Sequence, residues 1–116
     1  MLSGRRRRRL LHSAASFARS RVSGTAAPVF ASLSVTSRCD RACRYCRIHD
    51  EPEADLPLGE WLAIIDDLAG AGAAFVSLTG GEPLLRPDLP AIIRHCWRLG
   101  LYIDLHTNGA HPDQMD

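Results

Sequence analysis

Three cysteines lie within eight residues of one another and have side chains suited to binding a metal. Cys39, Cys43 and Cys46 form a C-x3-C-x2-C pattern. Cysteine thiolates select zinc or iron–sulfur clusters over hard cations. Three thiolates leave one iron of a four-iron cubane without a protein ligand, so that iron is open to reaction. The same spacing also fits a closed zinc site, because His49 follows Cys46 and completes a Cys3His set.

Two other short segments combine polar groups with glycines. The first has two glycines, which permit close backbone approach or a positive φ, and Glu82, which supplies a carboxylate. The second has an Asn-Gly pair. Taken alone, each segment is typical of a tight turn, so a chemical role depends on what lies beside it in the fold. The segments are Gly80-Gly81-Glu82-Pro83 and Thr107-Asn108-Gly109.

The hydrophobic pattern predicts the elements that position these segments. Apolar runs of strand length cover residues 30–36, 74–79 and 101–107, and apolar residues recur at helical spacing over 58–69 and 89–99. Strands and helices of these lengths span similar distances, so each helix returns the chain and the strands run parallel. The three polar segments follow the three strands and should meet at one sheet edge, where α/β proteins bind ligands.

The predicted helix ends carry familiar signals. Gly70 and Gly72 close the first helix, and Gly100 stops the second. Asp88 precedes the second helix and is a predicted N-cap. Cys96 falls on the apolar stripe of that helix, so we expect a small core residue there rather than a metal ligand.

The N-terminal 28 residues differ in composition from the rest of the chain. Residues 1–37 hold seven Arg and no acid, whereas residues 38–116 hold seven Arg against thirteen acids. Because residues 1–28 are rich in Arg, Ser and Ala and lack sustained apolar periodicity, we expect a solvated or weakly helical basic tail. An organelle transit peptide and an arm attracted to anionic surfaces are the alternatives. The folded domain is predicted over residues 29–116.

Length and composition limit the class of protein. A chain of 116 residues has room for one domain, and its 46% hydrophobic and 23% charged residues are typical of a globular protein. No window approaches the roughly 20 consecutive apolar residues of a membrane span. The clustered cysteines and the lack of a secretory apolar segment argue against a disulfide scaffold. The predicted compartment is the cytoplasm, or an organelle matrix if the N-terminus is a transit peptide.

The order and spacing of these motifs resemble the radical S-adenosylmethionine (SAM) superfamily. The resemblance rests on the three cysteines, on Tyr45 just before the third cysteine, and on the GGEP and TNG segments after the second and third strands. The stretches SVTSRCDRACRYC and LTGGEPLLRPDL are most similar to the branch with the molybdenum-cofactor GTP cyclase and the peptide-modifying maturases. The resemblance covers about residues 29–112 and implies an α/β fold, a parallel (βα)n half of a partial TIM-type barrel.

The resemblance also implies a cofactor set and a reaction. Cys39, Cys43 and Cys46 would hold a [4Fe–4S] cluster, and SAM would chelate the fourth iron. One electron would cleave SAM to a 5′-deoxyadenosyl radical, which abstracts hydrogen from an unknown substrate. A reductant such as flavodoxin or ferredoxin is the implied partner. The implied SAM-binding residues are Tyr45, Gly80, Gly81, Glu82, Pro83, Thr107 and Asn108, with the 80–82 segment against the SAM amino group and Tyr45 near the adenine.

The family resembles a six-unit partial barrel, whereas this sequence holds three strands. We therefore expect the N-terminal half of a radical SAM core domain, a fragment or truncated product that is inactive by itself and whose partner is a missing C-terminal half. Two alternatives remain open: a Cys3His zinc-binding interaction module and a non-catalytic remnant that keeps only the fold.

Overall fold

The computed structural model describes residues 4–46, 53–111 and 113. Three strands and two of the three α-helices follow the predicted order strand, helix, strand, helix, strand. The elements in chain order are α1 (Gly4–Ser23), β1 (Phe30–Ser34), α2 (Leu58–Ala71), β2 (Phe75–Thr79), the short 3-10 helix η1 (Pro83–Leu85), α3 (Leu89–Arg98) and β3 (Tyr102–Leu105).

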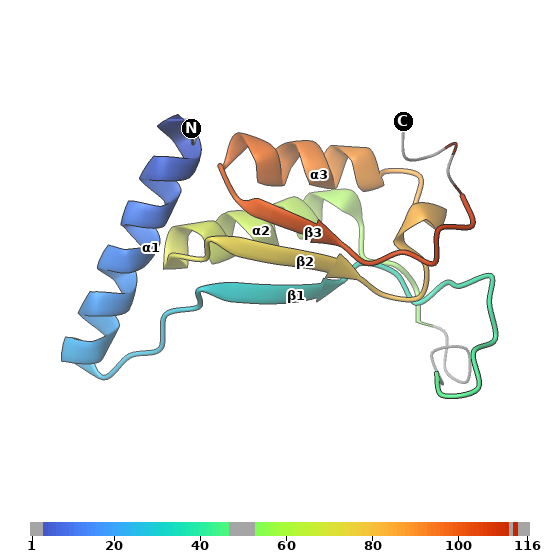
Figure 1. Ribbon diagram of the computed structural model, residues 1–116, viewed down its shortest axis with the longest axis horizontal. Coiled ribbons are helices and arrows are strands. Elements are labelled where there is room, and N and C mark those ends of the chain that lie inside the picture. Colours follow the sequence, from blue (N-terminus) through green and yellow to red (C-terminus); the bar gives the residue numbers. More distant parts are fainter. Residues whose placement is uncertain (1–3, 47–52, 112, 114–116) are drawn as a thin grey trace.

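The three strands form one parallel sheet in the order β1-β2-β3, which confirms the predicted α/β architecture. Leu33 pairs with Leu78, and Leu78 pairs with Leu105, so equivalent positions line up across the sheet. Because all three strands run in one direction, their C-terminal ends lie at the same edge (Figure 1).

The core lies between one face of this sheet and the helices α2 and α3 (Figure 1). Val76 and Leu78 of the central strand are almost completely buried and pack in one cluster with Ile65 of α2 and Ile92 of α3. Side chains alternate along a strand, so Phe75 and its neighbours at every second position point to the opposite face. Among the described residues, no helix covers that opposite face.

The helix ends agree with the predictions at one helix and differ at the other. Gly72 ends α2 with a φ of 112°, a left-handed conformation that glycine adopts without strain. Asp88 occupies the predicted N-cap position of α3, but its side chain makes no capping hydrogen bond. Its carboxylate instead accepts hydrogen bonds from Arg86. Asp88 is therefore the N-cap by position, as predicted, but its side chain does not cap the helix because the neighbouring Arg86 guanidinium binds the carboxylate.

The N-terminal segment is more ordered than the basic tail we expected. Residues 4–23 form α1, which lies across the end of the domain opposite the edge where the strands finish (Figure 1). Arg9 donates hydrogen bonds to the carbonyl oxygens of Ala69 and Leu99, at the C-terminal ends of α2 and α3. Carbonyls in the last turn of a helix lack the usual i+4 partner and carry partial negative charge, so a guanidinium is a favourable donor to them.

Small side chains let α1 approach closely. Ser13 and Ser16 are buried, and Ser16 packs so tightly against Gly72 that a Cβ at Gly72 would lie 2.5 Å from the Ser16 Cβ. This contact uses serine, arginine and backbone groups, so hydrophobic periodicity gave no sign of it. Within the ranges that the structure describes, no helix combines the length and apolar character needed to span a bilayer.

Candidate functional site

The three segments singled out in the sequence meet at one edge of the sheet. The cysteine loop follows β1, the GGEP segment follows β2 and the TNG segment follows β3, all at the end of the molecule opposite α1 (Figure 1). Parallel strands require this convergence, because their C-terminal ends share an edge. The fold thus brings together chain segments far apart in the sequence, as the hydrogen bond between Asp40 and Asn108, 68 residues apart, illustrates.

The GGEP segment extends the pairing of β1 and β2 beyond the sheet. The Gly81 N–H donates to the Thr36 carbonyl at 2.8 Å, and the Glu82 N–H donates to the Arg38 carbonyl at 2.8 Å. A Cβ at Gly81 would lie 2.2 Å from the Arg38 oxygen, and one at Gly80 would lie 2.3 Å from the Thr36 oxygen. Only glycine permits such contact, so the two glycines allow this segment to dock against the start of the cysteine loop.

Glu82 is completely buried and joins the GGEP segment to the TNG segment. Its Oε1 accepts hydrogen bonds from the Leu84 N–H at 3.0 Å and the Thr107 hydroxyl at 2.7 Å, and its Oε2 accepts one from the Asn108 N–H at 2.7 Å. A buried carboxylate needs such donors to offset its lost hydration. The Glu82 side chain therefore connects loops, and the resemblance alone did not indicate this role.

Asp40 connects the cysteine loop to the segment after β3. Its Oδ1 accepts a hydrogen bond from Asn108 Nδ2 at 2.9 Å, and its Oδ2 lies 2.8 Å from His111 Nε2. The hydrogen bonds from Asn108 and then from His111 hold the pKa of Asp40 below its usual value. Sequence reasoning missed this contact. Its only sequence signal was the position of Asp40 between two of the cysteines.

The start of the cysteine loop is held on its other side by residues 53–55. The Thr36 hydroxyl donates to Asp55 at 2.7 Å, and the Arg38 guanidinium forms an ion pair with the same carboxylate at 2.8 Å. Burial raises the pKa of Asp55, but the hydrogen bonds from Thr36 and Arg38 outweigh burial and leave it below its usual value. The Ser37 hydroxyl also donates to the Glu53 carbonyl at 2.8 Å.

Arg86 joins the segments that lead into the site, and sequence analysis did not predict this role. Its guanidinium is buried and donates to the Val35 carbonyl at 2.9 Å and to the Leu56 carbonyl at 2.8 Å. The carboxylate of Asp88 balances its charge. A buried arginine paired with backbone carbonyls from remote segments leaves no local sequence signal.

The cysteines that could hold a metal have free thiols and differ in exposure. Cys39 and Cys43 are half-buried and Cys46 is exposed, as is Tyr45, whose relative exposure is 91%. The Cys46 N–H donates to the Cys43 carbonyl at 3.0 Å and forms a turn. Over residues 4–46, 53–111 and 113, no three His, Cys, Asp or Glu side chains are gathered closely enough to hold a metal ion. Three thiols on one loop still match the donor chemistry of an iron–sulfur cluster.

The predictions for His49 and Cys96 have different outcomes. His49, the fourth ligand of the zinc alternative, lies outside the described residues. Cys96 is completely buried within the hydrophobic core, which confirms its predicted place, and burial raises the pKa of its thiol to about 11.

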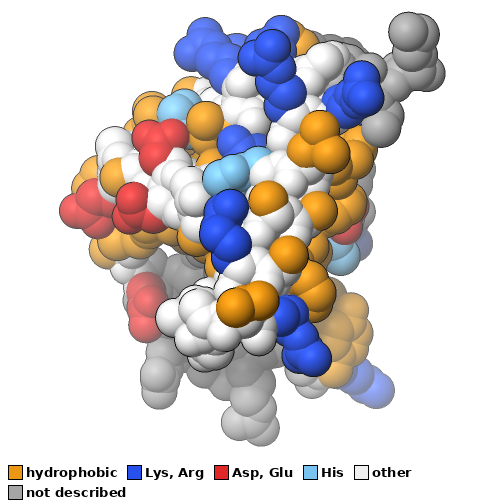
Figure 2. All heavy atoms as spheres, turned by 90° about the vertical axis from the view of Figure 1, so that its left-hand side faces the viewer, with side chains coloured by type: hydrophobic (Ala, Val, Ile, Leu, Met, Phe, Trp, Pro, Cys, Tyr) orange, Lys and Arg blue, Asp and Glu red, His pale blue; other side chains and the backbone are white. Residues whose placement is uncertain are grey.

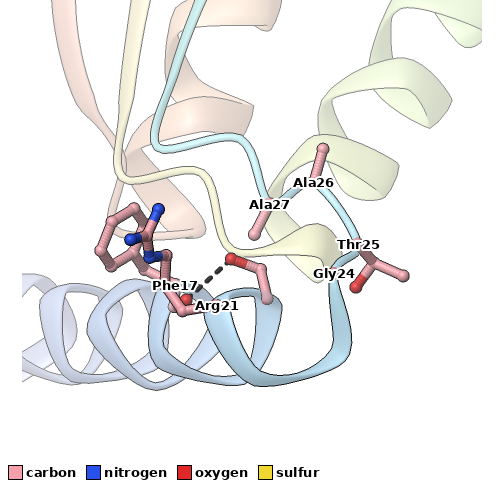
Figure 3. Close-up of a pocket in the computed structure, with 7 residues that line it drawn as sticks. Phe17, Arg21, Gly24, Thr25, Ala26 and Ala27 are labelled. Atoms are coloured by element: carbon pink, nitrogen blue, oxygen red, sulfur yellow. Dashed lines mark hydrogen bonds between the residues drawn. The ribbon is translucent and has the colours of Figure 1, made fainter.

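A hollow of about 450 Å³ lies away from this edge, where α1 leads into β1. Phe17, Arg21 and residues 24–27 line it, and the Ser20 hydroxyl donates to the Phe17 carbonyl there (Figure 3). It contains one charged side chain and no carboxylate, thiol or imidazole, so it offers little for chemistry.

Comparison with known proteins shows which family the chain belongs to. The profile of the Radical SAM superfamily matches residues 33–116. An S-adenosylmethionine-dependent nucleotide dehydratase from Selenomonas ruminantium is 38% identical over 79 residues, which are 67% of this chain and 29% of that protein. A PqqA peptide cyclase from Methylorubrum extorquens is 40% identical over 87 residues, 72% of this chain and 23% of the cyclase. The chain thus spans less than a third of the length of these curated relatives.

Solved structures show the same fold. Streptococcus suis SuiB bound to the precursor peptide SuiA superposes with a TM-score of 0.69 at 23% sequence identity, over 82% of this chain and 22% of SuiB. SuiB bound to S-adenosylmethionine gives the same TM-score over 79% of this chain. The three-stranded parallel sheet therefore matches part of a radical SAM partial barrel. The matched residues contain all three motif segments, and the chain belongs to the Radical SAM superfamily.

Proposed function

We propose that this chain carries the part of a radical SAM enzyme that binds the iron–sulfur cluster and SAM. The observation that carries the proposal is the meeting of the cysteine loop, the GGEP segment and the TNG segment at one sheet edge, where hydrogen bonds to the carboxylates of Glu82 and Asp40 join them. The named relatives are enzymes, a peptide cyclase and a nucleotide dehydratase. In this proposal the whole protein generates a 5′-deoxyadenosyl radical and abstracts hydrogen from a substrate.

Cys39, Cys43 and Cys46 would hold a [4Fe–4S] cluster, with one iron left for the amino and carboxylate groups of SAM. When bound, the cluster supplies the electron that cleaves SAM, and the protein contributes binding, orientation and exclusion of water. The start of the loop is held by three sets of hydrogen bonds, to residues 53–55, 80–82 and 108–111. Cys39 is therefore positioned more firmly than Cys43 and Cys46, which lie further from these hydrogen bonds along the loop.

The acceptors offered to the SAM amino group are backbone carbonyls. Among the described residues, no hydrogen bond ends on the carbonyl oxygen of Gly80 or Gly81, and both residues are partly exposed. Glu82 is buried and already accepts three hydrogen bonds. We assign the amino group to the two glycine carbonyls and a supporting role to Glu82. Tyr45 remains the proposed contact of the adenine, for which its exposed ring is free.

Metal analysis after anaerobic reconstitution with iron and sulfide tests the proposal. The chain should turn brown and bind about four irons. Replacing Cys39, Cys43 or Cys46 with Ala should abolish the colour, whereas the matched control Cys96→Ala should keep it, and His49→Ala should keep it too. Stoichiometric zinc that depends on His49 would contradict the proposal and favour the zinc-binding module.

Adding SAM to the reconstituted chain tests whether the chain binds SAM or is a non-catalytic remnant that keeps only the fold. The electron paramagnetic resonance spectrum of the reduced cluster should change with SAM, because one iron gains new ligands. An iron-loaded chain whose spectrum does not change with SAM would leave the proposed cluster ligands intact and overturn the proposed SAM binding.

A further inference from the structure

The helix α1 packs on the domain through its polar face, whereas an ordinary surface helix packs through its apolar face. The residues that face the domain are Arg9, Ser13, Ser16 and Ser20, which are buried or partly buried and lie at spacings of four, three and four. A face of an α-helix repeats with this spacing. The helix therefore packs on the domain through polar residues.

The opposite, outward face of α1 is apolar. Two positions further along the chain, the same spacing of four, three and four selects Leu11, Ala15, Ala18 and Val22, and all four are exposed. A shift of two residues is a rotation of about 200°, so this set lies on the far side of the helix. Leu11 is 63% exposed and Val22 is 91% exposed. We call these four residues the outer stripe.

Arginines border the outer stripe on both sides. By helical position, Arg8 and Arg19 lie along one side and Arg7 and Arg21 along the other. All four are exposed, and α1 contains no acidic residue. Figure 2, which looks onto this end of the molecule, shows hydrophobic side chains along the helix with arginines beside them.

The charges of α1 are only partly used inside the molecule. Arg5 lies over the ring of Trp97 and Arg6 over the ring of Tyr102, at 4.2 and 4.9 Å from the ring centres. Arg7 and Arg8 make no such contact with the described residues. They lie near the N-terminus of α1, which has a partial positive charge, so an anionic partner would relieve an unfavourable arrangement.

From this pattern we infer that α1 seats the protein on an anionic phospholipid surface. An apolar stripe with arginine on each side is the pattern of a helix that lies in the membrane interface, its apolar face among the acyl chains and its cations among the headgroups. The helix is about 30 Å long and forms one end of the molecule, so a flat surface can reach the whole stripe (Figure 1). The cysteine loop, at the opposite end, would point away from the lipid.

Vesicle co-sedimentation of the 116-residue chain tests this inference. The chain should bind vesicles with equal amounts of phosphatidylglycerol and phosphatidylcholine, and not vesicles of phosphatidylcholine alone. Binding should weaken as salt is raised, because salt screens exposed charges. Arg7→Gln and Arg8→Gln should each weaken binding by about fivefold, as expected for a cation near an anionic bilayer.

Variants of the outer stripe separate lipid seating from general charge attraction. Leu11→Glu and Val22→Glu should each reduce binding at least about tenfold, because each puts a carboxylate among acyl chains. Arg44→Gln, an equal charge change at the exposed end of the molecule away from α1, is the matched control and should bind like the unmodified chain. Circular dichroism should show that these variants remain folded, since all four residues of the outer stripe are exposed.

Three outcomes would overturn the inference. The first is no binding to anionic vesicles. The second is binding that responds to the arginine variants but not to Leu11→Glu and Val22→Glu, which would indicate charge attraction without seating. The third is a dimer in sedimentation equilibrium that Leu11→Glu dissociates, which would make a second copy of the chain the partner of the stripe.

Discussion

Replacing Glu82 with Gln should destabilise the site by a predictable amount. Glutamine keeps one carbonyl oxygen, which can still accept from the Leu84 N–H and the Thr107 hydroxyl. Its amide nitrogen then faces the Asn108 N–H, so two donors meet where the carboxylate accepted a hydrogen bond at 2.7 Å. A hydrogen bond to a charged group contributes about 1.5–3 kcal/mol.

Two effects place the expected loss within that range. Glutamine is neutral and is less costly to bury than a carboxylate, which offsets part of the loss. Asn108 itself is exposed, so water can partly satisfy its N–H. We therefore expect Glu82→Gln to lower the free energy of unfolding by about 2 kcal/mol, a large share of the roughly 5–15 kcal/mol of a typical domain.

Urea unfolding followed by circular dichroism measures this loss. Glu53→Gln is the matched control, since Glu53 is exposed and its side chain makes no described hydrogen bond, and it should change stability by less than about 0.5 kcal/mol. Thr107→Val removes one donor to Glu82, and combining it with Glu82→Gln should show non-additivity above about 0.5 kcal/mol. A Glu82→Gln chain as stable as the unmodified one would refute the argument. Faster hydrogen exchange at the Asn108 amide should accompany the loss.

Three further predictions concern other parts of the structure. Gly81→Ala should destabilise the chain and disturb the cysteine loop, because its Cβ would lie 2.2 Å from a backbone oxygen. The control Gly70→Ala, with open space around it in α2, should stabilise the chain by up to about 1 kcal/mol. Equal unfolding midpoints for the two variants would contradict this prediction. The thiol of Cys96 is buried and has a pKa of about 11, so at pH 8 only about one part in a thousand of it is ionised. The native, metal-free chain should therefore react with three equivalents of a thiol reagent, and the unfolded chain with four. The lowered pKa of Asp55 means that its ionisation stabilises the fold above its unfolded pKa, and that this contribution fades as pH falls below about 4. Asp55→Asn should therefore flatten the acid side of the profile of stability against pH. An unchanged profile would show that the hydrogen bonds from Thr36 and Arg38 to Asp55 are not kept in solution.

The order and direction of the elements were predictable from the sequence. Apolar runs and helical stripes are local patterns, and the strands and helices they predicted around β1, α2, β2, α3 and β3 are present within one to two residues at most ends. Parallel strands followed from the alternation of strand and helix, and the convergence of the three motif segments followed from parallel strands. Family membership was also readable, because it rests on short motifs at fixed spacing.

The connections within the site were not predictable in the same way. Glu82 contacts residues 25 and 26 positions away, and Asp40 contacts residues 68 and 71 positions away. No local pattern identifies the partner of a carboxylate at such a separation, because any donor that the fold brings within reach will serve. Only the tertiary structure shows that Glu82 joins loops and that Asp40 connects the cysteine loop to the segment after β3.

The docking of α1 also had to come from the tertiary structure. Residues 1–28 lack sustained apolar periodicity, and the short outer stripe that α1 does have is exposed and points away from the domain. The packed side works because Arg9 donates to carbonyls at the C-terminal ends of α2 and α3, and because Ser16 fits against Gly72. The sequence alone determined the three strands, the helices α2 and α3, their direction and the motifs they carry, since these depend on neighbouring residues. The fold decided which side of α1 is buried, since that depends on backbone groups that exist as acceptors only once α2 and α3 have formed.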